Sequence, residues 1–282
     1  METLKNFALN NGINIPSIGF GTYKLPDDPT TSEIVSRAIA DGYRNIDCAS
    51  YYGNQTAIGR GLAASGIQRD ELFVGSKVWN TDRGYDSTLR AFEKTLGELG
   101  LDYLDLYLLH WPASPSQTDE WRAINRSTWK ALERLVDEHC LRAAGVCNFR
   151  PRHLKALLTD ANILPAVNQI EYHPGEMQRP TVEFCRQNGI LVEAWSPLAR
   201  GRMFDNPVIR DIAAAHERSV AQISLRWELQ NGVLPLPKSA TPSRIAANLD
   251  IYDFSLTSAE MAAIDALDGL DSSGLDPDTI SF

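Results

Sequence analysis

Residues 72–111 contain one strand–helix–strand unit, which reads LFVGSKVW (72–79), STLRAFEKTLGELG (87–100) and YLDLYLLHW (103–111). The two outer segments are almost continuously apolar, which is typical of strands that are covered on both faces. The middle segment places its apolar residues at helical spacing. Because a parallel connection needs a crossover, the unit predicts two parallel strands joined by a helix.

The same alternation continues in both directions along the chain. It predicts further strands at 17–22, 43–49, 142–149, 166–172, 190–198 and 233–238. It predicts further helices at 31–42, 54–66, 127–140, 152–161, 180–189, 207–217, 221–232, 242–249 and 258–269. Eight strands, each followed by a helix, indicate an α/β fold of the (β/α)8 TIM barrel type with extra helices. An open doubly wound sheet uses the same alternation and remains the alternative.

The segment ALNNGINIPS (8–17) lies at the start of this pattern and contains an Asn-Asn-Gly turn. It predicts an N-terminal β-hairpin that covers the floor of the barrel. No linker rich in Pro, Gly or Ser divides the chain, so we expect a single barrel domain over residues 1–282.

Composition excludes several classes of protein. Hydrophobic residues make up 43% and charged residues 22% of the 282 residues, which is ordinary for a globular domain. The net charge is −9 and the pI about 5.1, which argues against a nucleic-acid or anionic-membrane binder. No apolar run is long enough for a membrane span, and METLKNFALNNG (1–12) lacks the apolar run of a signal peptide.

The cysteines show no spacing typical of a structural zinc site. Four thiols in a chain of this length also do not form a disulfide scaffold, so we expect reduced thiols in a cytoplasmic protein and no bound metal. They are Cys48, Cys140, Cys147 and Cys185.

The glycine motifs do not support a Rossmann dinucleotide site. GRGLAA (59–64) matches GxGxxA, but it lies inside a predicted helix with no strand before it. Gly19-Phe20-Gly21 begins a similar motif, but its sixth residue is Lys24. We interpret the glycines of 59–64 as small residues for close helix packing.

Four polar side chains fall at or just after the ends of predicted strands two to four. They are Asp47, Tyr52, Lys77 and His110. Each alone is compatible with a structural role, but TIM barrels place their chemistry at the C-terminal ends of the strands. A lysine inside an apolar strand needs a carboxylate partner, because unpaired burial of a charge is costly. We therefore expect the four residues to share one site.

The residue types at this rim suit the protonation of a carbonyl oxygen that receives a hydride. A tyrosine with a pKa near 10 is a weak acid, and a nearby ammonium lowers its pKa. Asp47 would keep Lys77 charged, Tyr52 would act as general acid, and an imidazole would donate a hydrogen bond to the substrate oxygen. The set contains neither an activated nucleophile nor a metal cluster.

Several motifs together resemble the aldo-keto reductase family over essentially the whole chain. They are GYRNIDCASYYGN (42–54), GSK (75–77), LLHWP (108–112), GVCNF (145–149), NQIEYHP (168–174), SPL (196–198) and PKS (237–239). Tryptophan at position 195, where tyrosine is common, resembles the pattern of the bacterial 2,5-diketo-D-gluconate reductase branch. Cys147, Gln55 and Ala247 depart from the usual serine, glutamate and acidic residue at these positions.

The resemblance implies an NADPH-dependent oxidoreductase that reduces aldehydes or ketones, with NADH as a weaker alternative. It implies Tyr52 as the proton donor, Lys77 and Asp47 as its modulators, and His110 as the residue that orients the carbonyl. It also implies cofactor contacts in four groups. They are Cys147, Asn148 and Gln169 at the carboxamide, Trp195 on the nicotinamide ring, Ser196 and Leu198 along the pyrophosphate, and Thr22 and Asp47 at the ribose.

The start of the helix predicted at 242–249 matches the family's site for the adenosine 2′-phosphate and adenine. Its residues are Lys238, Ser239, Thr241, Arg244 and Asn248. Two cations and two hydroxyls at a helix start form an anion site, and the 2′-phosphate is what separates NADP from NAD. NADPH is therefore the preferred cofactor.

The predicted substrate walls are Tyr23, Trp79 and Trp111, together with His110. The loop at 112–126 and the tail after 270 would complete an open pocket for a small carbonyl: an aldehyde, an α-keto ester, a diketone or a keto sugar. We expect a monomer. Two alternatives stay open: a regulatory NADPH-binding barrel with slow or no turnover, and a phosphate-handling barrel isomerase or lyase.

Overall fold

The computed structural model describes residues 6–115 and 117–280. In these residues one parallel sheet contains eight strands that pair in sequence order. The strands are β3 (Phe20–Gly21), β4 (Asn45–Asp47), β5 (Phe73–Val78), β6 (Leu104–Leu109), β7 (Leu141–Cys147), β8 (Val167–Glu171), β9 (Leu191–Trp195) and β10 (Val233–Pro235). Every strand predicted from the sequence is present.

The first and last strands meet and close the sheet into a barrel. The backbone N–H of Gly19 donates to the carbonyl of Pro235, and that of Gly21 donates to the carbonyl of Pro237, each at 3.0 Å. An open doubly wound sheet would leave both edges unpaired. The predicted (β/α)8 barrel is therefore confirmed.

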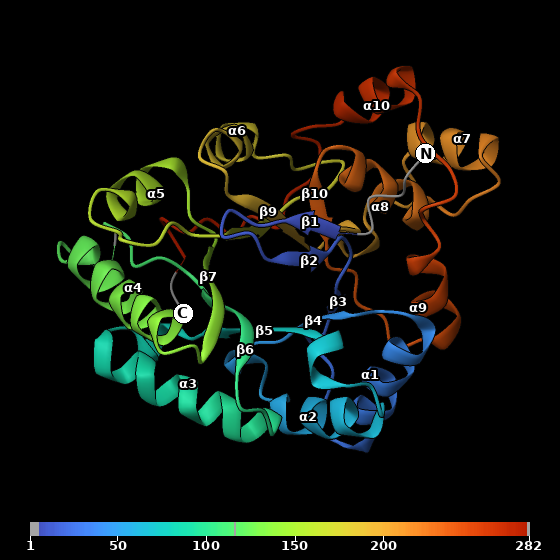
Figure 1. Cartoon of the computed structure of the whole chain (residues 1–282). Helices are drawn as coiled ribbons and strands as arrows, with labels where there is room; N and C mark the ends of the chain where they lie inside the picture. The colour runs from blue at the N-terminus through green and yellow to red at the C-terminus, as the bar shows by residue number, and fades with distance from the viewer. Residues whose placement is uncertain (1–5, 116, 281–282) are drawn as a thin grey trace.

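Helices surround the strands on the outside of the barrel (Figure 1). They are α1 (Pro29–Asp41), α2 (Gln55–Ala64), α3 (Tyr85–Leu99), α4 (Trp121–Asp137), α5 (Pro151–Leu158), α6 (Arg179–Gln187), α7 (Pro207–Ala215), α8 (Val220–Gln230), α9 (Pro242–Leu249) and α10 (Ser258–Asp265). No helix of the described ranges is long and apolar enough to cross a membrane.

Helices α1 and α4 begin earlier than the sequence pattern predicts, for local reasons. Helix α1 starts at Pro29 because the carboxylate of Asp28 accepts a hydrogen bond from the Thr30 N–H at 2.8 Å. Helix α4 starts at Trp121, six residues before the predicted position. Its first turns are fixed by Asn125, whose side chain bonds both the N–H and the carbonyl of Ala113 at 2.8 and 3.0 Å.

The predicted N-terminal hairpin is present as β1 (Asn6–Ala8) and β2 (Asn14–Pro16). Leu9 and Ile15 of this hairpin are buried and share one apolar cluster with Phe73 and Leu234. Because Phe73 is the first residue of β5, the hairpin covers the end of the barrel opposite the strand ends that carry the predicted site.

The glycines of 59–64 serve helix packing. A Cβ atom on Gly59 would lie 2.4 Å from the carbonyl oxygen of Leu99, and one on Gly61 would lie 2.7 Å from that of Ser32. Side chains at either position would push α2 away from its neighbours, which confirms the packing interpretation.

Helix α8 carries a fully buried carboxyl group, Glu228, from which a stability prediction follows. Glu228 is 0% exposed, and among the described residues neither of its carboxylate oxygens has a hydrogen-bond partner. Burial raises its pKa well above the ordinary value. The folded state therefore holds a proton that the unfolded state releases. The contribution of Glu228 to stability is thus most favourable below about pH 4 and becomes less favourable as the pH rises.

We expect Glu228→Gln to raise the free energy of unfolding by about 1–3 kcal/mol at pH 7 and by much less at pH 4. Urea denaturation of both proteins at the two pH values measures this difference. An equal effect at both pH values would contradict the assignment of a buried, proton-holding carboxyl.

Candidate active site

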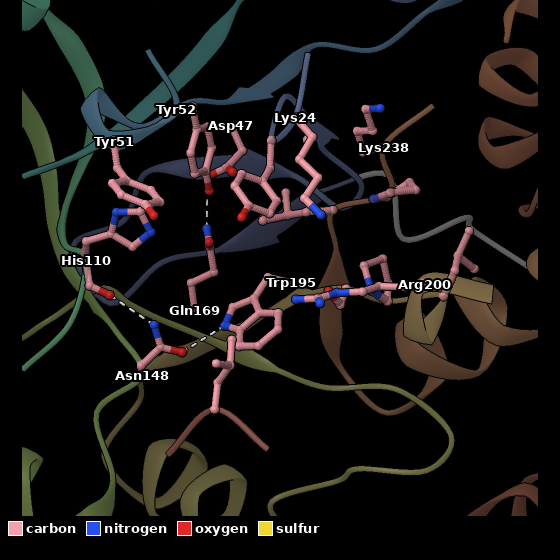
Figure 2. A pocket seen from close by; sticks show the side chains of 18 of the residues that line it. Lys24, Asp47, Tyr51, Tyr52, His110, Asn148, Gln169, Trp195, Arg200 and Lys238 are labelled. Atoms are coloured by element: carbon pink, nitrogen blue, oxygen red, sulfur yellow. Dashed lines mark hydrogen bonds between the residues drawn. The ribbon is translucent and has the colours of Figure 1, made fainter. Parts of the chain in front are cut away.

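The strand ends bring Asp47, Tyr52 and His110 to one pocket of about 400 Å³ (Figure 2). Lys77 is buried behind this lining, where it contacts Asp47 and Tyr52. Asp47 is the last residue of β4, and Lys77 lies near the end of β5. His110 follows β6, and Tyr52 ends a short 3-10 helix after β4. The barrel geometry thus places four residues from three successive units beside one another.

Lys77 is the centre of the polar contacts at this site. Its ammonium lies 2.6 and 2.7 Å from the two carboxylate oxygens of Asp47, 2.8 Å from the carbonyl of Cys48 and 3.1 Å from the Tyr52 hydroxyl. The lysine is 0% exposed and Asp47 8% exposed. The pair thus meets the condition under which a buried charge is tolerated, namely a partner of opposite charge with good geometry.

The pKa of Tyr52 lies above its ordinary value, which differs from the lowered pKa expected from the sequence. Burial raises this pKa, and the ammonium of Lys77 lowers it by less. The phenol therefore carries its proton at neutral pH. The charge on Lys77 acts chiefly after proton transfer, because it faces the oxygen on which the negative charge would form.

His110 is a neutral imidazole in this environment. Burial, the charge of Lys77 and the charge of Arg83 hold its pKa well below the ordinary value. Its backbone carbonyl accepts a hydrogen bond from the Asn148 side chain at 2.9 Å. Its ring lies edge-on to the ring of Trp79, with centroids 5.0 Å apart. A neutral imidazole has one N–H to donate, so His110 can act as a hydrogen-bond donor toward the pocket.

The facing wall comes from β7, β8 and β9. The indole N–H of Trp195 donates to the side-chain oxygen of Asn148 at 2.8 Å, which fixes the plane of the indole beside the pocket. The Gln169 amide nitrogen lies 2.9 Å from Asp47. Two predicted cofactor residues lie behind this lining: Cys147 is 1% exposed, and the Thr22 hydroxyl donates to the Asp47 carbonyl at 2.8 Å.

Aromatic side chains form the outer part of the pocket. The predicted residues Tyr23, Trp79 and Trp111 all line it. Sequence reasoning missed Tyr51, whose ring stacks on Trp79 with centroids 3.8 Å apart. Its position directly before Tyr52, at the same strand end, is the signal that could have identified it.

The C-terminal tail also reaches the pocket, as expected, and Leu275 is part of the lining. Glu171 at the end of β8 holds this tail, because its carboxylate accepts hydrogen bonds from the backbone and the hydroxyl of Ser273 at 3.0 and 2.5 Å. An ion pair between Arg202 and Asp271 at 2.7 Å adds a second anchor.

One end of the pocket is cationic. Lys24, Arg200 and Lys238 line it, and no ion pair joins any of them to a carboxylate of the described residues. Sequence reasoning gave no cofactor role to Lys24 or Arg200. Both adopt a positive φ, 63° and 54°, in the loops after β3 and β9. Both follow the C-terminal ends of strands, where TIM barrels place their chemistry, so the sequence could have suggested them. Their backbone conformation cannot be predicted from the sequence.

The other residues predicted for the 2′-phosphate and adenine lie around the start of α9. The Ser239 hydroxyl accepts a hydrogen bond from the Thr241 N–H at 3.0 Å, which shapes the turn before the helix. Thr241 and Arg244 are exposed, whereas Ser239 and Asn248 are buried. Two exposed cations thus lie near the start of α9: Lys238 precedes the helix, and Arg244 is in its first turn.

Residues 17–269 match the Aldo/keto reductase family. The chain belongs to the aldo-keto reductase family. It is 47% identical over 274 residues to the glyoxal reductase of Bacillus subtilis (strain 168), covering 97% of this chain and 96% of that protein. It is 46% identical over 290 residues to the morphine 6-dehydrogenase of Pseudomonas putida, again covering 97% and 96%.

A solved structure gives the same result at the level of the fold. The aldo-keto reductase of Bombyx mori, crystallised in complex with NADP, superposes with a TM-score of 0.86 at 35% identity, over 94% of this chain and 92% of that one. The predicted resemblance is thus confirmed, and the protein is an NAD(P)H-dependent carbonyl reductase.

The pocket of this aldo-keto reductase suits a nicotinamide dinucleotide. The positive charges of Lys24, Arg200 and Lys238 match the negative charge of the cofactor's phosphates. At the other end, the fixed indole of Trp195 offers a flat apolar surface to an aromatic ring. The cationic end and the end beside Trp195 are thus distinct, and the Tyr52 hydroxyl lies toward the latter (Figure 2).

Proposed function

We propose that this protein reduces small aldehydes and ketones to alcohols with NADPH, and that Tyr52 donates the proton to the carbonyl oxygen. The observation that carries the proposal is the Lys77 ammonium, which contacts Asp47 at 2.6 Å on one side and the Tyr52 hydroxyl at 3.1 Å on the other. This arrangement supports a phenol that can lose its proton inside a buried site.

The proton transfer follows from the charges at this site. Tyr52 holds a proton at neutral pH, since a phenol has an ordinary pKa near 10 and burial raises that pKa further. When the proton moves to the substrate oxygen, the new phenolate lies beside the Lys77 ammonium, and opposite charges at this distance attract strongly where water is excluded. Asp47 keeps Lys77 charged and in place. NADPH, when bound, supplies the hydride that the carbonyl carbon accepts.

His110 orients the substrate in this proposal. Its neutral imidazole donates one N–H to the carbonyl oxygen, on the side of the pocket that faces Tyr52. The His110 and Tyr52 rings lie edge to face with centroids 5.8 Å apart, so one oxygen atom can approach both polar groups. An uncharged imidazole leaves Tyr52 as the acid of the reaction.

The cofactor contacts are proposed from the same placement. Asn148 and Gln169 would hold the carboxamide, with Cys147 behind them. Trp195 would cover the nicotinamide ring, and Thr22 and Asp47 would support its ribose. Ser196 and Leu198, with Lys24 and Arg200, would hold the pyrophosphate. The 2′-phosphate and adenine would lie at the start of α9, against Lys238, Ser239, Thr241, Arg244 and Asn248.

The preference for NADPH over NADH is testable at Arg244. We expect Arg244→Ala to raise the Kd of NADPH about tenfold and that of NADH less than twofold, because only NADPH carries the 2′-phosphate. Quenching of tryptophan fluorescence measures both constants. Arg210→Ala on α7 is the control, since it removes another exposed guanidinium elsewhere. Equal losses for the two cofactors would contradict the assignment.

The substrate class is tested by a carbonyl screen with both cofactors. The panel contains glyoxal, chosen because a relative is a glyoxal reductase, together with small aldehydes, α-keto esters, diketones and keto sugars. The aromatic lining by Tyr23, Tyr51, Trp79 and Trp111 supports substrates with an apolar part next to the carbonyl. We expect NADPH oxidation with at least one member, followed as loss of absorbance. Binding without turnover on any member would favour the regulatory alternative.

A further inference from the structure

Glu193 lies in the interior of the barrel, one layer below the pocket. It is the middle residue of β9, where side chains alternate between the two faces of the strand, so it points to the same side as Trp195. It is 2% exposed. An apolar layer that includes Val167 and Leu234 fills the barrel interior beside it. The carboxyl group therefore lies between an apolar cluster and the active site.

A single amide connects Glu193 to the active site. Gln169 lies directly opposite Glu193 in the register of β8 and β9. Its side-chain nitrogen lies 2.9 Å from a Glu193 oxygen and 2.9 Å from a carboxylate oxygen of Asp47. An amide nitrogen has two hydrogens, so it can donate to both carboxyl groups at once. Only the nitrogen end can do so, which fixes the orientation of the Gln169 amide.

The charges around Glu193 do not balance. The titratable groups that face it are Asp47 on β4, Lys77 on β5 and Cys147 on β7, whereas β10 presents the apolar Leu234. Both oxygens of Asp47 contact the Lys77 ammonium, and among the described residues no second cation faces Glu193. Burial, together with the charge of Asp47, raises the pKa of Glu193 to about 7.

We propose that Glu193 is a positioning residue of the reductase: it holds the Gln169 amide against Asp47, and its ionisation adds a negative charge beneath the nicotinamide end of the pocket. This inference rests on the proposed function. The oxidised nicotinamide ring carries a positive charge and the reduced ring does not. An ionised Glu193 therefore favours binding of NADP⁺ over NADPH, and a protonated Glu193 does not.

The test is the ratio of the two dissociation constants, Kd of NADPH over Kd of NADP⁺, measured by tryptophan fluorescence at pH 6 and pH 8. Both forms share the 2′-phosphate, so its own ionisation cancels in the ratio. For the unmodified enzyme we expect the ratio to rise about three- to tenfold from pH 6 to pH 8, since one unit of pKa change on binding corresponds to tenfold. A ratio independent of pH would overturn the proposal.

Two variants separate the charge of Glu193 from its contact with Gln169. Glu193→Gln keeps an oxygen that accepts a hydrogen bond from Gln169, but the new side chain does not titrate. The ratio of Kd for NADPH to Kd for NADP⁺ should therefore change less than twofold between the two pH values. Glu193→Leu also removes the acceptor, so we expect about tenfold weaker binding of NADPH even at pH 6. Unchanged NADPH affinity in Glu193→Leu would overturn the positioning role.

Glu228→Gln is the matched control, because it removes another fully buried carboxyl group that lies outside the pocket lining. Its ratio should follow that of the unmodified enzyme at both pH values. If Glu193→Gln retained the full pH dependence, the proposal would be wrong. Failure of the unmodified enzyme to bind either cofactor would instead contradict the proposed function, so the two failures are distinguishable.

Discussion

Replacing Tyr52 with phenylalanine should lower kcat for carbonyl reduction by about 10²- to 10⁴-fold, the usual contribution of a general acid. The variant removes the hydroxyl that contacts Lys77 and leaves the aromatic ring in place. Single-turnover oxidation of bound NADPH measures the chemical step directly. Residual turnover within tenfold of the unmodified enzyme would contradict the proton-donor role.

The same variant should still fold and bind NADPH. The Lys77 ammonium retains three contacts, two with Asp47 and one with the Cys48 carbonyl, so no buried charge loses its partner. Tyr51→Phe is the control, since it removes a hydroxyl from the adjacent residue and keeps the ring that stacks on Trp79. We expect its kcat to change less than about threefold, because its hydroxyl takes no part in the proposed proton transfer.

The barrel could be predicted from the sequence because its signal is repeated. Each strand of the unit at 72–111 must be apolar on both faces. Because crossover connections between parallel strands are right-handed, few topologies are possible for eight such units. The exact ends of the helices were harder to predict from the sequence. The start of α4 depends on the contact between Asn125 and Ala113, which no local periodicity encodes.

The site followed from the barrel, since the strand-end rule selects Asp47, Tyr52, Lys77 and His110 from the sequence alone. The sign of the Tyr52 pKa shift could not be predicted. It depends on how completely neighbouring side chains exclude water, and the Tyr23 ring, 5.0 Å away, belongs to another strand end. The bridge from Glu193 through Gln169 to Asp47 spans three strands, so it too appears only once the register is known.

Replacing Lys77 with methionine should reduce both stability and activity. Methionine has a side chain of similar length but leaves the Asp47 carboxylate buried without its cation. Breaking a buried ion pair in this way costs about 3–5 kcal/mol. We expect a loss of that size in the free energy of unfolding, measured by urea denaturation at pH 7. Lys94→Met is the control: Lys94 is exposed on α3, so the expected change is below about 0.5 kcal/mol.

The double variant Asp47→Asn, Lys77→Met separates structure from catalysis. It removes both charges, so we expect it to recover most of the lost stability, because a buried pair replaced as a unit is often neutral. Its kcat should stay at least about 10²-fold low, since no ammonium remains to stabilise the Tyr52 phenolate. A double variant as unstable as Lys77→Met would show that the ammonium stabilises the fold through Cys48 and Tyr52 rather than by neutralising Asp47. Recovery of activity together with stability would show that Tyr52 needs no cation to give up its proton.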